Sequence, residues 1–243
     1  MQGQEFYRQL AAYYDELFPV DTKSVEFLRQ RAGSGVRVLD AASGTGAHAL
    51  ALKREGIDVY GVDNSPEMVE VAKQKEPSHF AEMDMRSVDR HAKRPFSLVY
   101  CIGNSVSHLP FPGDGASFLG ALFNALQPEG RGVVQIIDVS DLDAGTVYPL
   151  PTLTGLGCRM ERSYTVDGVT DDGVTTLRFD AELHLESEGR RKSISQRLLA
   201  LSPFSLETMA REAGFPTVTV TSGFTDRPYS SGESRIAVVE ARR

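Results

Sequence analysis

The chain has few cysteines, no long apolar run and no apolar leader. Cys101 and Cys158 are too few for a disulfide framework and lack metal-ligand spacing, so we expect two core thiols and no metal site. No apolar run approaches the roughly 18 residues of a membrane span. The first ten residues, MQGQEFYRQL, have no apolar signal core, so we expect a mature cytoplasmic protein.

Basic residues are not in excess. Lys and Arg total 26 against 33 Asp and Glu, a formal net charge of −7. A nucleic-acid surface needs a basic face, so a nucleic-acid partner is not expected. Residues 86–94 and 190–197 are basic but interrupted, and we interpret them as solvated faces. The acidic balance favours cationic small molecules, and the oligomeric state stays open.

Strand-like and helix-like patterns alternate between residues 36 and 138. We expect strands over 36–40, 58–63, 79–84, 96–102 and 132–137, and helices over 47–55, 66–75 and 116–127. The Pro128-Glu129-Gly130 turn should separate the last helix from the last strand. Strands spaced by helices indicate a parallel sheet with right-handed crossovers.

The flanking segments complete a larger fold. Helices over 6–17 and 22–33 come first, and a helix capped by Ser205 (205–213) and strands over 216–221 and 235–241 come last. After a loop through Pro149 and Pro151, residues 156–166, 177–185 and 194–200 alternate with period two, with turns at 167–168, 172–173 and 188–189. We therefore predict an α/β fold with a doubly wound, mostly parallel seven-stranded sheet and an inserted antiparallel β-meander. The expected division is a helical cap (1–35), a core (36–150 and 202–243) and a covering subdomain (151–201).

The segment VRVLDAASGTG is the strongest local signal for function. A strand ending in Asp40 is followed by a loop with Gly44 and Gly46, where backbone can approach a ligand closely. Asp63 ends the next strand, and an acid at this spacing usually holds ribose hydroxyls. The loop indicates an adenosine-containing cofactor. It leaves a nicotinamide dinucleotide open, since Ala49 is an accepted variant of the third glycine.

Five motifs together resemble the class I S-adenosylmethionine-dependent methyltransferases over nearly the whole chain. They are LDAASGTGAHALAL, GVDNSPEMVEVA, MDMRS, FSLVYCIGNSVSHL and ALQPEGRGVV. The resemblance implies a Rossmann-like methyltransferase fold and S-adenosyl-L-methionine as cofactor, and its later motifs exclude a nicotinamide dinucleotide.

Within that family, CIGNSVSHLP and AAYYDELF are similar to glycine N-methyltransferases and related small-amine methylases. Those enzymes tend to carry His-Arg-Asn after strand five, whereas this chain has Asp138-Val139-Ser140-Asp141. The residues expected to grip a glycine carboxylate are therefore not visible, and the resemblance does not identify glycine as the acceptor.

Carried over residue by residue, the resemblance assigns cofactor contacts to the glycine loop, the ends of strands two to four and an N-terminal tyrosine. The residues are Tyr14, Asp40, Ala41, Gly44, Gly46, Asp63, Asn64, Met68, Met83, Asp84, Met85, Ile102, Gly103 and Asn104. Met83 and Met85 either contact adenine or fill space. Tyr14 is favoured over Tyr13 and either covers the cofactor or packs the first helix.

The catalytic candidates are His108, Asp141 and Tyr14. His108 is either a proton acceptor or a capping histidine, and Asp138 and Asp141 are either ligands or loop caps. We predict in-line methyl transfer to a small molecule at an amine nitrogen, with residues 104–108 and the strand-five acids beside the acceptor and the meander as its roof. The alternatives are an O-methyltransferase, a tRNA-base methyltransferase or a non-catalytic cofactor-binding protein.

Overall fold

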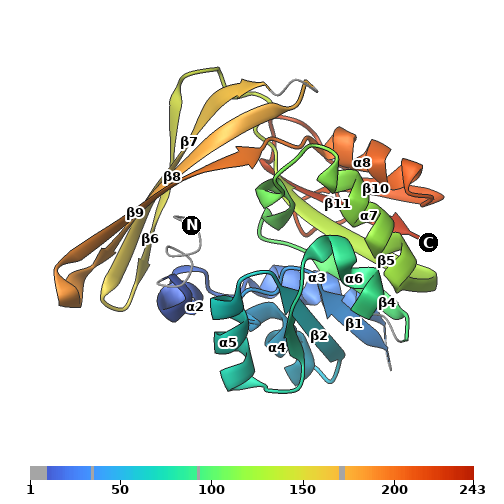
Figure 1. Ribbon diagram of the computed structural model, residues 1–243. Helices are drawn as coiled ribbons and strands as arrows, with labels where there is room; N and C mark the ends of the chain where they lie inside the picture. The colour runs from blue at the N-terminus through green and yellow to red at the C-terminus, as the bar shows by residue number, and fades with distance from the viewer. Residues whose placement is uncertain (1–9, 34–35, 92–93, 170–172) are drawn as a thin grey trace.

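The computed structural model describes residues 10–33, 36–91, 94–169 and 173–243, and contains two sheets (Figure 1). The larger sheet has the order β10-β11-β5-β4-β1-β2-β3, and all of its strands are parallel except β11. Its strands are β1 (Arg37–Asp40), β2 (Asp58–Asp63), β3 (Phe80–Glu82), β4 (Phe96–Cys101), β5 (Leu126–Ile137), β10 (Thr217–Ser222) and β11 (Ile236–Arg242). The predicted mostly parallel, seven-stranded sheet is confirmed.

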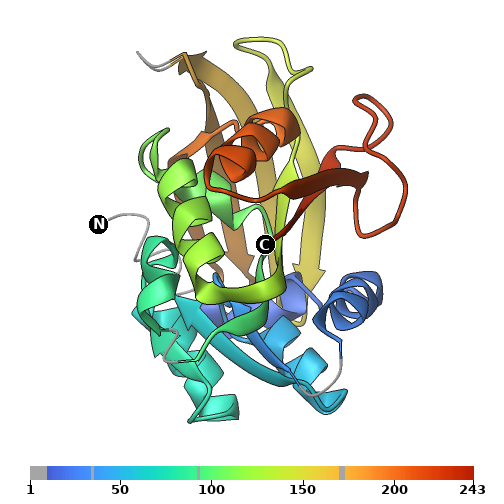
Figure 2. The ribbon, with the colours of Figure 1, turned by 90° about the vertical axis from the view of Figure 1, so that its right-hand side faces the viewer.

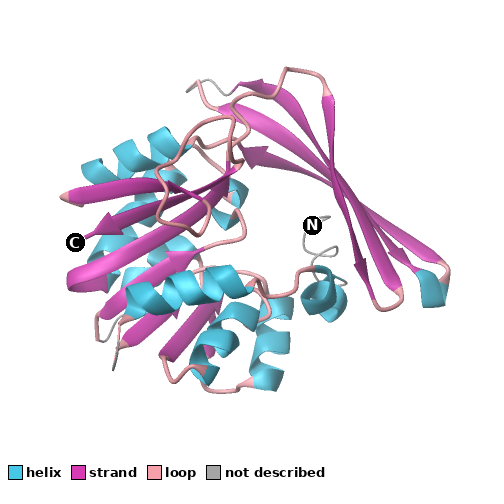
Figure 3. Ribbon diagram, turned by 180° about the vertical axis from the view of Figure 1, so that it is seen from behind, coloured by secondary structure: helices cyan, strands magenta, loops and turns pink. Residues whose placement is uncertain are grey.

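Helices cover both faces of this sheet (Figure 3). On one face lie α3 (Thr22–Ala32), α4 (Ala47–Arg54) and α5 (Pro66–Lys75), whose buried side chains share a core with Val38, Val59 and Leu98. On the other lie α6 (Val88–His91), α7 (Asp114–Ala125) and α8 (Pro203–Glu212), packed against Val99, Val134 and Val239. The sheet is therefore doubly wound, as predicted.

Capping side chains explain where these helices begin. The Ser65 Oγ accepts the Met68 amide at 3.3 Å, and Pro66 fills the first position of α5, as expected. The predicted cap of α8 at Ser205 is wrong. Ser202 caps this helix instead and accepts the Ser205 amide at 3.0 Å, because Pro203 lacks an N–H and suits the first helical position.

The predicted break between α7 and β5 is also wrong. The strand begins at Leu126, directly after the helix, and pairs through the Pro128-Glu129-Gly130 stretch. Its backbone hydrogen bonds go to the C-terminal residue: Glu129 N donates to Arg243 O at 3.0 Å, and Arg243 N donates to Gly130 O at 2.9 Å. A left-handed Glu129 (φ 63°) absorbs the irregularity, so turn residues here lie within a strand.

The second sheet, here called sheet B, is antiparallel with the order β6-β7-β8-β9. Its strands are β6 (Val147–Gly155), β7 (Cys158–Val169), β8 (Thr175–Leu185) and β9 (Arg190–Leu199). The meander is confirmed, but the loop predicted through Pro149 and Pro151 is an edge strand, where prolines are tolerated. The turn predicted at 167–168 is wrong, since both residues belong to β7; the one predicted at 172–173 falls partly outside the described residues.

Sheet B packs across the carboxyl end of the larger sheet (Figures 1 and 2). One apolar cluster joins Val139, just after β5, to Tyr164, Leu177 and Leu198 of sheet B. A second joins Leu17 of α2 (Tyr14–Leu17) to sheet B residues such as Met160 and Leu183. We call the face with these side chains the inner face, and the opposite face the outer face.

The N-terminal segment is only partly described. The helix predicted over 6–17 is the short η1 (Ala11–Tyr13) followed by α2, and residues 6–9 of that prediction lie outside the described residues. Within the described ranges, no helix is both long and apolar enough to cross a membrane.

Candidate functional site

The loop between β1 and α4 depends on two glycines with left-handed backbone. Gly44 has φ 52° and Gly46 has φ 78°. A Cβ on Gly46 would lie 2.4 Å from Cζ of Phe80, so only glycine fits between this loop and β3. The Gly44 amide donates to Oδ2 of Asp63 at 2.8 Å, which links the loop to the end of β2.

Two acidic side chains beside this loop are largely buried, and no basic side chain of the described residues pairs with them. Asp40, at the end of β1, is 2% exposed, and the Asp63 Oδ1 accepts the Ser65 amide at 2.9 Å. Burial raises the pKa of Asp40 to about 7, to which the nearby Asp63 charge contributes; burial also raises the pKa of Asp63. Neither acid forms an ion pair with a lysine or arginine of the described residues. The loop therefore suits a ligand that carries positive charge.

Tyr14 of α2 faces these acids, whereas Tyr13 does not. The Tyr14 ring lies 3.7 Å from where a Cβ on Gly44 would be. Burial and the charges of Asp63, Asp40 and Asp15 raise the pKa of Tyr14 to about 12, so its phenol is neutral. The Tyr13 hydroxyl donates to Glu188 at the far end of sheet B, 3.4 Å away.

Asp15 is a residue that sequence reasoning missed. Its carboxylate accepts hydrogen bonds from the Thr45 hydroxyl and from the Lys75 ammonium, and Lys75 also donates to the Thr45 carbonyl at 2.9 Å. These bonds fasten α2 to the glycine loop and to α5. The sequence feature that could have identified Asp15 is its position directly after Tyr14.

The segment after β3 holds the residues predicted beside adenine. The Met83 amide donates to the Asp63 carbonyl at 2.9 Å, and Met83 and Met85 are partly buried against the core. The Asp84 carboxylate is paired with Arg86 at 2.6 Å, which lowers its pKa. Of the other two positions predicted near Asp63, Met68 is buried in α5 and Asn64 is exposed.

The segment after β4 is held by two buried amide side chains. The Gln135 Oε1 on β5 accepts the backbone amides of Gly103 at 2.7 Å and Asn104 at 3.3 Å. Asn104 is left-handed (φ 61°), and its Oδ1 accepts the Ile137 amide and the Ser107 hydroxyl, each at 3.0 Å. Sequence reasoning missed Gln135. The feature that could have identified it is its position as one polar residue in an otherwise apolar part of the strand.

The same segment contacts sheet B. His108, in the 3₁₀ helix η3 (Ser105–His108), contacts Gln196 of β9, and its burial lowers its pKa to about 4. The Asn104 side chain interacts with the Tyr164 hydroxyl on β7. The segment after β4 therefore lies between the core sheet and the inner face of sheet B.

The acids after β5 are both held by the β10–β11 connection. Asp138 is 6% exposed and accepts the Tyr229 hydroxyl at 2.5 Å and the Ser140 amide at 3.0 Å. Asp141 is exposed and forms a two-pronged ion pair with Arg235, at 2.6 and 3.0 Å. Each carboxylate has a partner within the protein, and a catalytic role for Asp141 stays a prediction.

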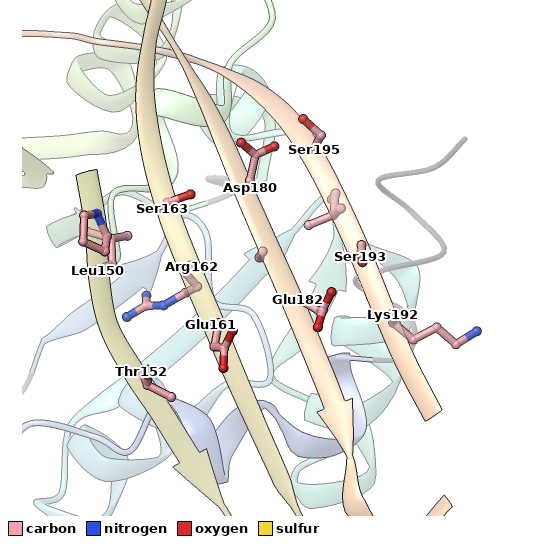
Figure 4. Close-up of a pocket in the computed structure, with 13 residues that line it drawn as sticks. Leu150, Thr152, Glu161, Arg162, Ser163, Asp180, Glu182, Lys192, Ser193 and Ser195 are labelled. Atoms are coloured by element: carbon pink, nitrogen blue, oxygen red, sulfur yellow. The ribbon is translucent and has the colours of Figure 1, made fainter. Parts of the chain in front are cut away.

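A hollow of about 840 Å³ lies along sheet B (Figure 4). Its lining includes Glu161, Asp180 and Glu182, which the alternation of the strands places on the outer face, and also Leu150, Arg162 and Ala181, which it places on the inner face. It includes no residue of the glycine loop. In the described chain, no group of three or more His, Cys, Asp or Glu side chains could hold a metal ion.

Comparison with known proteins identifies the family. The profile of the "Methyltransferase domain" family matches residues 38–130. The glycine/sarcosine N-methyltransferase of Aphanothece halophytica is 31% identical over 77% of this chain and 69% of its own. That of Halorhodospira halochloris is 30% identical over 76% of this chain and 74% of its own. The chain belongs to the class I S-adenosylmethionine-dependent methyltransferases.

The fold of this methyltransferase agrees with that assignment. The CcbJ methyltransferase of Streptomyces caelestis superposes with a TM-score of 0.78 at 23% identity, over 96% of this chain and 95% of that one. The predicted family, Rossmann-like fold and cofactor, S-adenosyl-L-methionine, are confirmed. Asp40 and Asp63, which form no ion pair within the described residues, suit this cofactor, because it carries cationic sulfonium and ammonium groups and a ribose whose hydroxyls can donate hydrogen bonds.

Proposed function

We propose that this methyltransferase methylates an amine nitrogen of a small molecule held between the segment after β4 and the inner face of sheet B. The contact between His108 and Gln196 carries the proposal, because it marks where sheet B closes over the carboxyl edge of the core. Such a roof limits the acceptor to a small molecule. The choice of nitrogen rests on the two relatives named for N-methylation of glycine and sarcosine.

The cofactor would lie along the carboxyl ends of β1, β2 and β4. Asp63 would hold the ribose, and Asp40 and the loop with Gly44 and Gly46 the methionine end. Residues 83–85 would flank adenine, residues 102–104 would face the methyl group, and Tyr14 would cover the site. When bound, the cofactor supplies a methyl group on a positively charged sulfur, which an amine lone pair can attack directly.

The electrostatics of His108 decide what it contributes. An amine with a lysine-like pKa of about 10.4 costs about 4.6 kcal/mol to present as free base at pH 7. Because the pKa of His108 is about 4, this side chain cannot hold the released proton at neutral pH. We assign it the orientation of the acceptor. Burial lowers the pKa of the amine itself, and alignment can contribute about 7–11 kcal/mol.

Turnover of matched amines and phenols tests the proposal. Formation of S-adenosylhomocysteine with amines, and not with phenols of similar shape, is the expected result. His108→Ala should lower kcat/KM. Asp141→Asn tests whether the acids after β5 also contribute to binding the acceptor. Unchanged turnover in both variants would place the acceptor elsewhere. Turnover of phenols alone would show that the acceptor atom is oxygen and not nitrogen. A mobility shift with tRNA would favour a tRNA-base acceptor.

A further inference from the structure

Arg162 is a charged side chain on the apolar inner face of sheet B. It lies on β7 in phase with Met160 and Tyr164, which are 1% and 6% exposed. Its cross-strand neighbours on the same face are Leu150 on β6 and Ala181 on β8. A cation at this place needs a partner to offset the loss of hydration.

The protein satisfies only some of the hydrogen-bond donors of the Arg162 guanidinium. One terminal nitrogen of Arg162 donates to the Pro151 carbonyl at 3.0 Å, and the guanidinium lies 5.6 Å from the centre of the Phe18 ring. Its Nε is buried without a hydrogen-bond partner. In the part of the chain that the structure describes, no carboxylate forms an ion pair with Arg162.

Other arginines of sheet B differ in this respect. Arg178 is paired with Asp180 at 2.9 Å, and Arg159 with Glu161 at 3.5 Å. The alternation of the strands places these residues on the outer face. Because the neighbouring acids point away from the inner face, none of them can neutralise Arg162. Burial lowers the pKa of Arg162, the direction expected for a desolvated cation that lacks an anion.

Contacts place Arg162 next to the proposed reaction site on two sides. The Phe18 ring beneath it stacks on Tyr14, with ring centres 4.8 Å apart, and Tyr14 in turn lies against Gly44. On the other side, Tyr164 follows two positions along the same face and interacts with Asn104 after β4. Arg162 therefore lies between the elements that would cover the cofactor and those that would face the acceptor.

We propose that Arg162 binds an oxyanion on the acceptor, so that the substrate is an amine that also carries a carboxylate or phosphate group. The inference rests on the proposed function and names its substrate class. A guanidinium presents parallel N–H donors that match two oxygens of such a group. This anchor comes from β7 of the roof.

Matched substrates provide the first test. Amino carboxylates are compared with their primary amides, and aminoalkyl phosphates with the corresponding amino alcohols. The wild-type enzyme should prefer the anionic member of at least one pair by about 10- to 100-fold in kcat/KM, the range expected for hydrogen bonds to a charged group. Which pair shows the preference distinguishes a carboxylate from a phosphate. Equal turnover within both pairs overturns the inference.

Substitution then locates the preference. Arg162→Met keeps an apolar stem and should abolish the preference mainly through KM, while Arg162→Lys should retain part of it. Arg159→Met, on the outer face of the same strand, is the matched control and should leave the preference unchanged. If Arg162→Met lowers turnover of both members by the same factor, Arg162 is structural and the inference is wrong.

A binding measurement separates this inference from the proposed function. Trimethylated amino acids keep the carboxylate but cannot accept another methyl group. Calorimetry with S-adenosylhomocysteine present should show such a compound binding the wild-type protein, and its primary amide binding about 10-fold or more weakly. Arg162→Lys, the variant least disturbing to folding, should reduce the difference. If amines are not methylated and the difference persists, the proposed function fails and the anion site stands. If the carboxylate and the amide bind equally, and a trimethylammonioalkyl phosphate binds no more tightly than the corresponding alcohol, the anion site is refuted.

Discussion

The Oδ2 oxygen of Asp63 accepts a hydrogen bond of 2.8 Å from the backbone amide of Gly44, so the end of β2 fixes the loop that follows β1. The carboxylate also accepts the Ser65 amide at the start of α5. One acid thus orients two neighbouring backbone segments before any ligand arrives. Its replacement should therefore disturb both the loop and the proposed contact with ribose.

Substitutions at Asp63 should separate these two effects. Asp63→Asn keeps an oxygen for the Gly44 amide but loses the charge, and we expect it to weaken S-adenosylhomocysteine binding about 10- to 100-fold. Asp63→Ala removes both and should weaken binding further. Asp58→Asn, at the exposed start of the same strand, should bind as the wild type does. Calorimetric titration measures all three, and normal affinity in Asp63→Ala would refute the assigned role.

The raised pKa of Asp40, about 7, should make cofactor binding release a proton. The folded, ligand-free protein favours protonated Asp40, so this group stabilises the fold below the usual carboxyl pKa of about 3.9, and that stabilisation is lost as pH rises through 7. A cationic cofactor favours the ionised carboxylate. Affinity for S-adenosylmethionine should therefore increase from pH 5 to about 7 and then level off.

Calorimetry in buffers of different ionisation enthalpy checks this linkage. At pH 6 we expect release of up to about one proton on binding to the wild-type protein. Asp40→Asn should bind more weakly, release no proton and show little pH dependence over this range. Equal proton release in the wild type and in Asp40→Asn would assign the titration to another group.

Most of the core could be predicted because its patterns are local. The alternation of strand and helix from residue 36 onward follows from short apolar runs, glycines and caps such as Ser65. The failures occur where long-range pairing overrides local signals. The prolines of β6 look like a loop until Arg162 and Tyr164 of β7 are seen to pair with that edge strand. Likewise, Gly130 lies in β5 because Arg243, at the far end of the sequence, completes its hydrogen bonding.

In the candidate site, too, features set by local sequence could be predicted, and features set by long-range contacts could not. Asp40, Gly44 and Asp63 lie together because they follow adjacent parallel strands, which a sequence motif encodes. The partners of Asp84, Asp138 and Asp141 could not be predicted, since Arg86, Tyr229 and Arg235 are recruited by tertiary contacts. Arg162 does have a local sequence signal, because it is a charged residue in phase with Met160 and Tyr164 on an apolar face.

Asn104 should contribute to stability through its side-chain oxygen. Asn104→Ala leaves the Ile137 amide without its partner, at a cost of about 1–3 kcal/mol, and puts alanine, which tolerates left-handed backbone less well than asparagine, at φ 61°, at roughly 1–2 kcal/mol more. Asn104→Gly removes only the hydrogen bonds, and Asn104→Asp keeps the oxygen. Denaturant unfolding should therefore show the wild type as the most stable protein, followed in decreasing order by Asn104→Asp, Asn104→Gly and Asn104→Ala. Asn124→Ala, exposed on α7, should stay within about 0.5 kcal/mol of the wild type.

Gly46→Ala should destabilise the protein and weaken cofactor binding together, because a Cβ there would lie 2.4 Å from the Phe80 ring. Overpacking of this kind costs about 1–3 kcal/mol, in addition to roughly 1–2 kcal/mol for the left-handed backbone. Gly56→Ala is the matched control, since Gly56 is also left-handed (φ 82°) but no atom lies within 4 Å of its Cβ position. It should show the backbone cost alone and bind S-adenosylhomocysteine normally. If the clash with Phe80 is the cause, Phe80→Leu should restore part of the stability and affinity lost in Gly46→Ala. Equal losses in the two alanine variants would show instead that the glycine is needed only for its backbone angle.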